Sequence, residues 1–168
     1  MGASDDATAV QGRRLLRHAV WIFFTSTFVA GGSFTLSITS GVGTESQFRT
    51  AHTGGTVHAA LLFGVAGCLR LLKLDDDDTR SLVTSSAVMG WGNTLGYLIG
   101  AYLSARGLKP VTISTKPPFL LDLDGSGPLG SIARNTVPNL LFGAAILALM
   151  RFIHLVHKGT RSGDEKPE

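Results

Sequence analysis

Four long stretches without a charged residue set the strongest limit on how this chain folds. No Asp, Glu, Lys or Arg occurs in residues 18–44, 50–69, 81–105 or 135–150. A helix needs about 20 mostly apolar residues to cross the roughly 30 Å hydrocarbon layer of a membrane. The first three stretches reach that length, and the fourth reaches it across Arg151, because an arginine can extend its charged end to the headgroups. The sequence therefore predicts an integral membrane protein.

The stretches predict an all-α fold, a transmembrane four-helix bundle that forms one domain over residues 13–158. Charged residues make up only 16% of the 168 residues, against roughly 25% in an average soluble domain. We expect a mobile polar tail over residues 1–12 and a polar tail over residues 159–168. The predicted spans cover residues 18–40, 51–73, 81–104 and 136–157.

Basic residues lie at the ends of the apolar stretches, which argues against nucleic acid as a partner despite a net charge of +3. A nucleic-acid-binding protein gathers such residues in a patch or stripe, whereas membrane proteins keep most of them on the cytoplasmic side. With four spans, the side that carries both termini holds ten of the fifteen Lys and Arg residues. We predict a multi-pass protein of a bacterial inner membrane with both termini in the cytoplasm.

Polar side chains inside membrane spans are rare because their burial is costly, so they mark candidate functional residues. The second stretch contributes His52 and His58, and the third contributes Asn93 and Tyr97. In antiparallel neighbouring spans all four fall at a similar depth, opposite the termini. Asn93 and Tyr97 share a helix face, whereas about 120° separates the two histidines around their helix axis. The pattern indicates a polar site, although a tyrosine or histidine near a span end is also typical of an interfacial anchor.

Four short motifs are spread over most of residues 49–150. They are Ala51-His52-Thr53-Gly54 within Arg49 to Gly64, Gly90-Trp91-Gly92-Asn93 with Tyr97, Arg106-Gly107-Leu108, and Pro138 with Leu141-Phe142-Gly143. These motifs resemble those of the styrene oxide isomerase family, small membrane enzymes that rearrange epoxides to aldehydes. The chain length, the four spans and the long connection before the last span agree with the same family.

The resemblance implies a homotrimer of four-helix subunits with haem b between neighbouring subunits. It implies His52 as the axial ligand of a ferric iron, which keeps an open position and acts as a Lewis acid on the epoxide oxygen. Tyr97 matches the family tyrosine that contacts the substrate oxygen, and its phenol can donate a hydrogen bond to developing negative charge. Asn93 and Trp91 match positions that line the pocket or pack the helices.

Two residues depart from the family pattern. His58 stands where the family has a functional asparagine, and Met89 stands where it has an aspartate. His58 can still bond the substrate or supply a proton, or it can close the open iron position from a neighbouring subunit. Met89 removes a carboxylate and is itself a possible weak iron ligand. The haem prediction is therefore firmer than styrene oxide as the substrate.

These observations lead to one main hypothesis and two alternatives. The main hypothesis is a membrane haem b isomerase that rearranges an apolar epoxide, which partitions into the lipid bilayer, to an aldehyde or ketone without net redox change. The first alternative is a non-catalytic or electron-carrying membrane haem b protein with His58 or Met89 as a second axial ligand. The second needs no haem and is a membrane scaffold or transporter subunit assembled through its polar third span.

Overall fold

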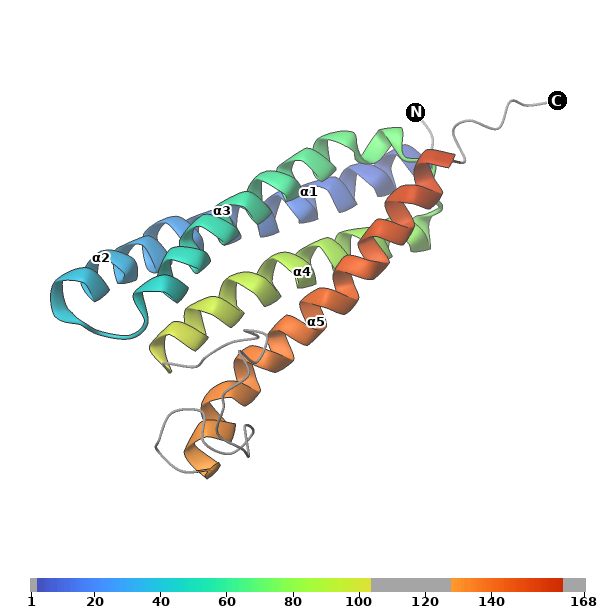
Figure 1. The fold of residues 1–168 in the computed structure, drawn as a ribbon. Coiled ribbons are helices and arrows are strands. Elements are labelled where there is room, and N and C mark those ends of the chain that lie inside the picture. The colour runs from blue at the N-terminus through green and yellow to red at the C-terminus, as the bar shows by residue number, and fades with distance from the viewer. Residues whose placement is uncertain (1–2, 104–127, 162–168) are drawn as a thin grey trace.

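The computed structural model describes residues 3–103 and 128–161, which form helices joined by short turns and contain no strand. The helical segments lie side by side as a bundle (Figure 1). In chain order they are α1 (Ala3–Phe24), the π-helical turn η1 (Thr25–Ala30), α2 (Gly31–Ser40), α3 (Glu45–Cys68), the 3₁₀ turn η2 (Leu69–Leu71), α4 (Asp76–Tyr102) and α5 (Pro128–Arg161). Because α1, η1 and α2 follow one another without a break, they form one long helical rod, called the first rod below. The predicted all-α four-helix bundle is confirmed.

Three of the four helical segments are long and apolar enough to cross a membrane: Asp6–Ser40, Glu45–Leu71 and Asn135–Arg161. Helix α4 is not among them, although the sequence predicts a span over residues 81–104. Its polar and small side chains are accommodated because α4 packs against α1, α3 and α5 and buries 14 of its 27 residues. At 1.5 Å per residue α4 is about 40 Å long. It is the helix most enclosed by its neighbours.

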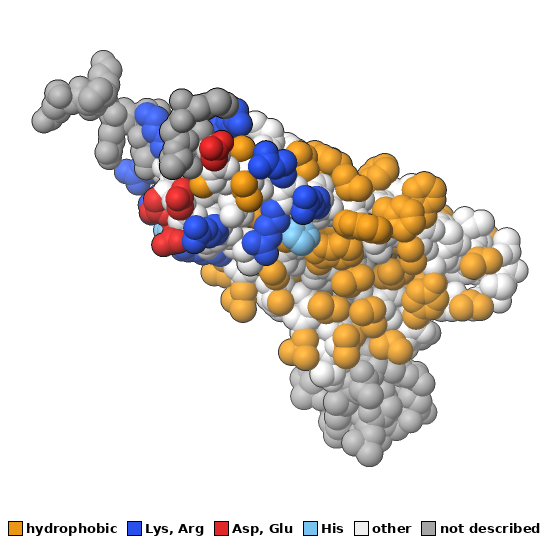
Figure 2. Space-filling view, turned by 180° about the vertical axis from the view of Figure 1, so that it is seen from behind, with side chains coloured by type: hydrophobic (Ala, Val, Ile, Leu, Met, Phe, Trp, Pro, Cys, Tyr) orange, Lys and Arg blue, Asp and Glu red, His pale blue; other side chains and the backbone are white. Residues whose placement is uncertain are grey.

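The outer surface of the bundle is apolar where a membrane would contact it. Trp21, Phe28, Val57, Leu140 and Leu147 expose between 59% and 69% of their surface. Figure 2 shows such side chains over the middle of one face, with most charged side chains gathered toward one end. Exposed apolar surface of this extent is unusual on a soluble monomer. The arrangement indicates a membrane protein.

Helices extend into both terminal segments. The sequence predicts a mobile tail over residues 1–12, and α1 begins within it at Ala3; residues 7–11 of α1 lie beside the start of α4 near Thr79. At the other end α5 continues to Arg161. Most of the long connection that the sequence predicts between residues 104 and 136 lies outside the described residues, and α5 starts within it at Pro128.

Charged residues join α4 to α5 at the end of the bundle where α1 begins. Asp75 caps α4 by accepting a hydrogen bond from the Asp78 backbone N–H at 2.7 Å. The Asp78 carboxylate accepts hydrogen bonds from Lys158 and, at 3.3 Å, from Arg151. The hydrogen bond from Lys158 lowers the pKa of the Asp78 carboxyl below its ordinary value of 3.8, since it favours the charged form.

Glycines allow α4 and α5 to approach closely in the middle of the bundle. A Cβ atom at Gly92 would lie 2.7 Å from the backbone oxygen of Leu141, and one at Gly96 would lie 2.7 Å from the Phe142 ring. Real Cβ atoms do not approach other atoms that closely, so only glycine fits at both positions. Small residues serve the same purpose between helices in membranes.

Candidate functional site

His52 lies in the second turn of α3 and contacts the π-helical turn of the first rod. Its Nδ1 atom lies 2.9 Å from the backbone oxygen of Ser26. The same oxygen accepts the backbone N–H of Gly31, five residues further along. Regular α-helices use bonds over four residues, and single turns of this wider type are frequent at functional sites. The irregular turn therefore places a carbonyl oxygen at His52.

The contact with Ser26 determines which His52 nitrogen carries the proton. A backbone carbonyl only accepts hydrogen bonds, so Nδ1 is the protonated nitrogen and donates to it. Nε2 then carries the lone pair, and no described residue forms a hydrogen bond with it. A Cβ at Gly31 would lie 3.1 Å from Nδ1, so the missing side chain there lets the ring approach the first rod.

The environment of His52 fits an axial metal ligand. Metal-ligating histidines almost always donate their second ring N–H to a carbonyl or carboxylate, which fixes the ring and its tautomer. Within residues 3–103 and 128–161, no group of three or more His, Cys, Asp or Glu side chains could hold a metal ion. Haem iron needs only one or two ligands from the protein, and the anchored His52 ring, with its Nε2 lone pair, would be able to supply one.

Small hydroxyl residues lie next to His52, where η1, α3 and α4 cross. Thr56 donates its hydroxyl to the His52 carbonyl at 2.8 Å, and its oxygen lies 3.4 Å from that of Ser26. A Cβ on Gly55 would lie 2.5 Å from Ser26 Cβ and 3.0 Å from the Thr94 hydroxyl oxygen. Gly55 thus permits the close crossing that brings the Ser26 carbonyl to His52.

His58 forms hydrogen bonds within α3 and with α4. Its Nδ1 atom lies 2.6 Å from the Gly54 carbonyl oxygen, so Nδ1 is protonated and donates. The unprotonated Nε2 accepts a hydrogen bond from the Asn93 side-chain Nδ2 at 3.3 Å. The same Nδ2 donates to the Met89 carbonyl oxygen at 3.1 Å. Both ring nitrogens of His58 are therefore engaged within its own subunit.

Trp91 and Met89 both contribute to the packing of the bundle. The Trp91 indole N–H donates to Nδ1 of His18 at 3.3 Å, which ties α4 to α1. Sequence reasoning missed this pair, and its only signal was a histidine at the start of the first stretch. The Met89 side chain is 2% exposed and belongs to the core.

Tyr97 lies against α5 and the core near the turn between α2 and α3. Its ring packs edge-on against Phe142 with the centroids 4.7 Å apart. It also contacts the cluster formed by buried Ala30, Phe48, Ala51, Leu98 and Ala101. Among the described residues none forms a hydrogen bond with the Tyr97 hydroxyl, which is left available to a ligand.

The candidate residues lie at one level of the bundle but not in one cluster. The contacts between α3 and α4 pair His58 with Asn93 and Gly55 with Thr94, so antiparallel register places Tyr97 beside the turn that carries His52. His52 nevertheless faces η1, His58 faces α4, and Tyr97 faces α5. The 120° separation of the histidines is thus visible as contacts with different helices.

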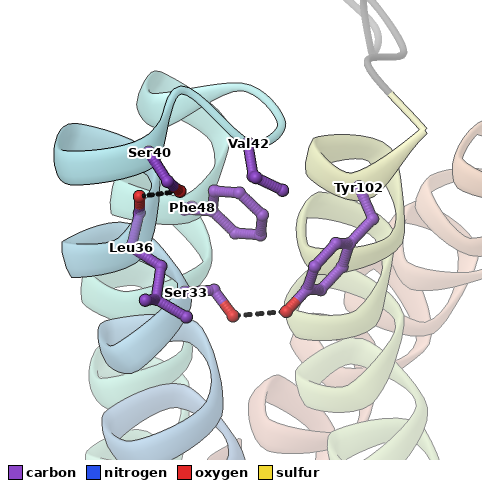
Figure 3. A pocket seen from close by; sticks show the side chains of 6 residues that line it. All are labelled: Ser33, Leu36, Ser40, Val42, Phe48 and Tyr102. Carbon is purple, nitrogen blue, oxygen red and sulfur yellow. Dashed lines mark hydrogen bonds between the residues drawn. The ribbon is translucent and has the colours of Figure 1, made fainter.

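The pocket drawn in Figure 3 is separate from these residues. It has a volume of about 80 Å³ and lies between α2, the start of α3 and the end of α4. At its edge the Ser33 and Tyr102 hydroxyls lie 2.5 Å apart. Its lining consists of Ser33, Leu36, Ser40, Val42, Phe48 and Tyr102. None of the predicted site residues lines it.

Comparison with known protein families identifies one match, which covers residues 11–157 and is described as styrene oxide isomerase. This chain belongs to the styrene oxide isomerase family. The match includes every candidate residue discussed above, from His18 to Phe142, and it agrees with the predicted family. No curated protein matches the chain. Membership of the styrene oxide isomerase family supports an isomerase-type function.

Proposed function

We propose that the protein is a membrane haem b isomerase that rearranges an apolar epoxide to an aldehyde or ketone. The observation that carries this proposal is the geometry of His52. Its Nδ1–H is anchored on the Ser26 carbonyl at 2.9 Å, and its Nε2 keeps an available lone pair. Haem b held by His52 would supply a ferric Lewis acid for the epoxide oxygen.

The proposed reaction needs no external reactant. One C–O bond of the epoxide breaks, a hydride moves from the neighbouring carbon to the electron-poor carbon, and the oxygen becomes a carbonyl. Atoms and electrons balance within the substrate. The protein has to hold the substrate, exclude water from the electron-poor carbon, and stabilise the charge that develops on the oxygen.

Tyr97 is suited to stabilise that charge. Its hydroxyl has no hydrogen-bond partner among the described residues, and its ring is held by the edge-on contact with Phe142. A phenol O–H donor that is already oriented acts on the developing charge without reorganisation. The apolar outer surface of α1, α3 and α5 suits a substrate that arrives through the bilayer.

The surroundings of His58 and of Met89 weigh against the alternative of an electron-carrying haem protein with two axial ligands. Both nitrogens of His58 are bonded inside its own subunit, to Gly54 and Asn93. Met89 is buried in the core. Either residue would have to leave these surroundings to reach an iron. From the family resemblance we further propose a homotrimer. We also propose that both termini lie in the cytoplasm, which the uneven distribution of Lys and Arg residues supports.

The experiment is turnover of styrene oxide by haem-loaded protein in nanodiscs, without oxygen or reductant. With two deuterium atoms on the terminal epoxide carbon, the aldehyde should keep both, because one migrates to the neighbouring carbon and one remains. The His52→Ala variant should be inactive, and His157→Ala, a change on the exposed end of α5, should retain activity. Loss of deuterium to water, or equal activity of both variants, would contradict the proposal.

A further inference from the structure

The side-chain amide of Asn93 is held in one orientation by two acceptors. Its Nδ2 donates to the Met89 carbonyl oxygen at 3.1 Å and to His58 Nε2 at 3.3 Å. A carbonyl oxygen cannot donate, so the NH₂ group and not the oxygen must face it. His58 cannot donate from Nε2 either, because its one proton is on Nδ1 and bonded to the Gly54 carbonyl at 2.6 Å. Both contacts therefore select the same orientation.

The consequence concerns the opposite end of the amide. Both Nδ2 hydrogens are used inside the bundle, so Asn93 has no donor left for a ligand. Within the described part of the chain, no hydrogen bond uses Asn93 Oδ1. That oxygen is also absent from the fully buried side-chain atoms without a partner, which belong to Gln11, Thr94 and Asn139. Asn93 thus offers an accessible acceptor.

Asn93 stands one helical turn from Tyr97, on the same face of α4. That face therefore carries a donor, the Tyr97 hydroxyl, and an acceptor, Asn93 Oδ1. A ligand complementary to both has an acceptor oxygen and an O–H or N–H group.

We propose that Asn93, positioned by His58, selects epoxides that carry a hydroxyl group in addition to the epoxide oxygen, such as a hydroxylated aryl epoxide. The inference rests on the proposed isomerase function for the epoxide itself. His58 is then a positioning residue, which acts through Asn93 and does not touch the substrate. This gives the histidine a role different from that of a proton donor.

The test compares two ligands that differ in one hydrogen-bond donor, 3-methylphenol and 3-methylanisole. Their binding to the haem-loaded protein in detergent is measured by calorimetry, which does not depend on turnover. The phenol should bind about tenfold more tightly than the ether, the size of one hydrogen bond. The Asn93→Leu variant has a side chain of similar shape without the oxygen and should lose this preference. The ratio in that variant also corrects for the different partition of the two ligands.

Two further variants separate positioning from general stability. His58→Phe keeps a ring but removes the Nε2 acceptor, so the amide can turn and the preference for the phenol should fall. Tyr97→Phe removes the neighbouring hydroxyl and should leave the preference intact. The same ratio in wild-type protein, Asn93→Leu and His58→Phe would overturn the proposal, as would the absence of binding of either ligand. Because no epoxide is involved, a failure here is distinct from a failure of the isomerase proposal.

Discussion

Replacing Gly31 by alanine tests how the first rod orients His52. The new Cβ would lie 3.1 Å from His52 Nδ1 and 3.4 Å from Cε1. The first distance is shorter than an ordinary van der Waals contact, so the ring has to move by a few tenths of an ångström. The hydrogen bond to the Ser26 carbonyl, now 2.9 Å, would then lengthen beyond the range in which such bonds are strong. Loss of a comparable outer contact costs metal sites about 10- to 100-fold in affinity.

The neighbouring glycine gives a matched control. A Cβ at Gly32 meets nothing within 4 Å, and both substitutions gain a similar helix propensity of about 0.5–1 kcal/mol. The two purified variants are titrated with haem and followed at the Soret band. The haem affinity of Gly31→Ala should be at least about tenfold lower than that of the wild-type protein, and the affinity of Gly32→Ala should be unchanged. Equal haem affinity in the two variants would refute the role assigned to the contact between His52 and the π-helical turn.

Three further predictions concern the bundle, each read from thermal unfolding in detergent. Gly96→Ala places a Cβ against an α5 ring and should destabilise by about 1–3 kcal/mol, whereas Gly143→Ala meets nothing within 4 Å and should not. Asp78→Asn should remove the loss of thermal stability at acidic pH that comes from the ion pairs between α4 and α5. Because the pKa of Asp78 is lowered on folding, its contribution is present above pH 3.8 and is lost as the pH falls through the lowered pKa; the exposed Asp77→Asn is the control. Trp91→Phe loses one hydrogen bond to α1 and should cost about 0.5–1.5 kcal/mol, and an unchanged melting temperature would contradict that.

The number of helices was predictable because charge is excluded from hydrocarbon, and uncharged runs are visible in the sequence. The similar depth of His58 and Asn93 followed from the same runs, since adjacent spans joined by a short turn are antiparallel; their hydrogen bond is visible only in the structure. Helix α4 was harder to place. Its Gly and Ser residues indicate close packing, but only the structure shows that 14 of its 27 residues are buried and that α4 packs against α1, α3 and α5.

Other features depend on contacts that no local pattern encodes. Residues 25–30 contain no glycine or proline that would predict a π-helical turn, yet this turn supplies the carbonyl that orients His52. The position of Ala7, Val10 and Gln11 beside the start of α4 is likewise not visible in a short polar segment of the sequence. The sequence predicts a similar depth for the candidate residues and an angle of about 120° between the two histidines, but the group that each ring contacts is visible only in the structure.

The most direct test of the central claim is the absorption spectrum of the detergent-purified protein after expression with ample haem. The account predicts a Soret band typical of five-coordinate ferric haem with one histidine, absent from His52→Ala and retained in His157→Ala. A band that survives in His52→Ala, or wild-type protein that takes up no haem, would contradict the account. Six-coordinate low-spin iron that becomes five-coordinate in His58→Ala would instead show that His58 leaves Gly54 and Asn93 to bind iron.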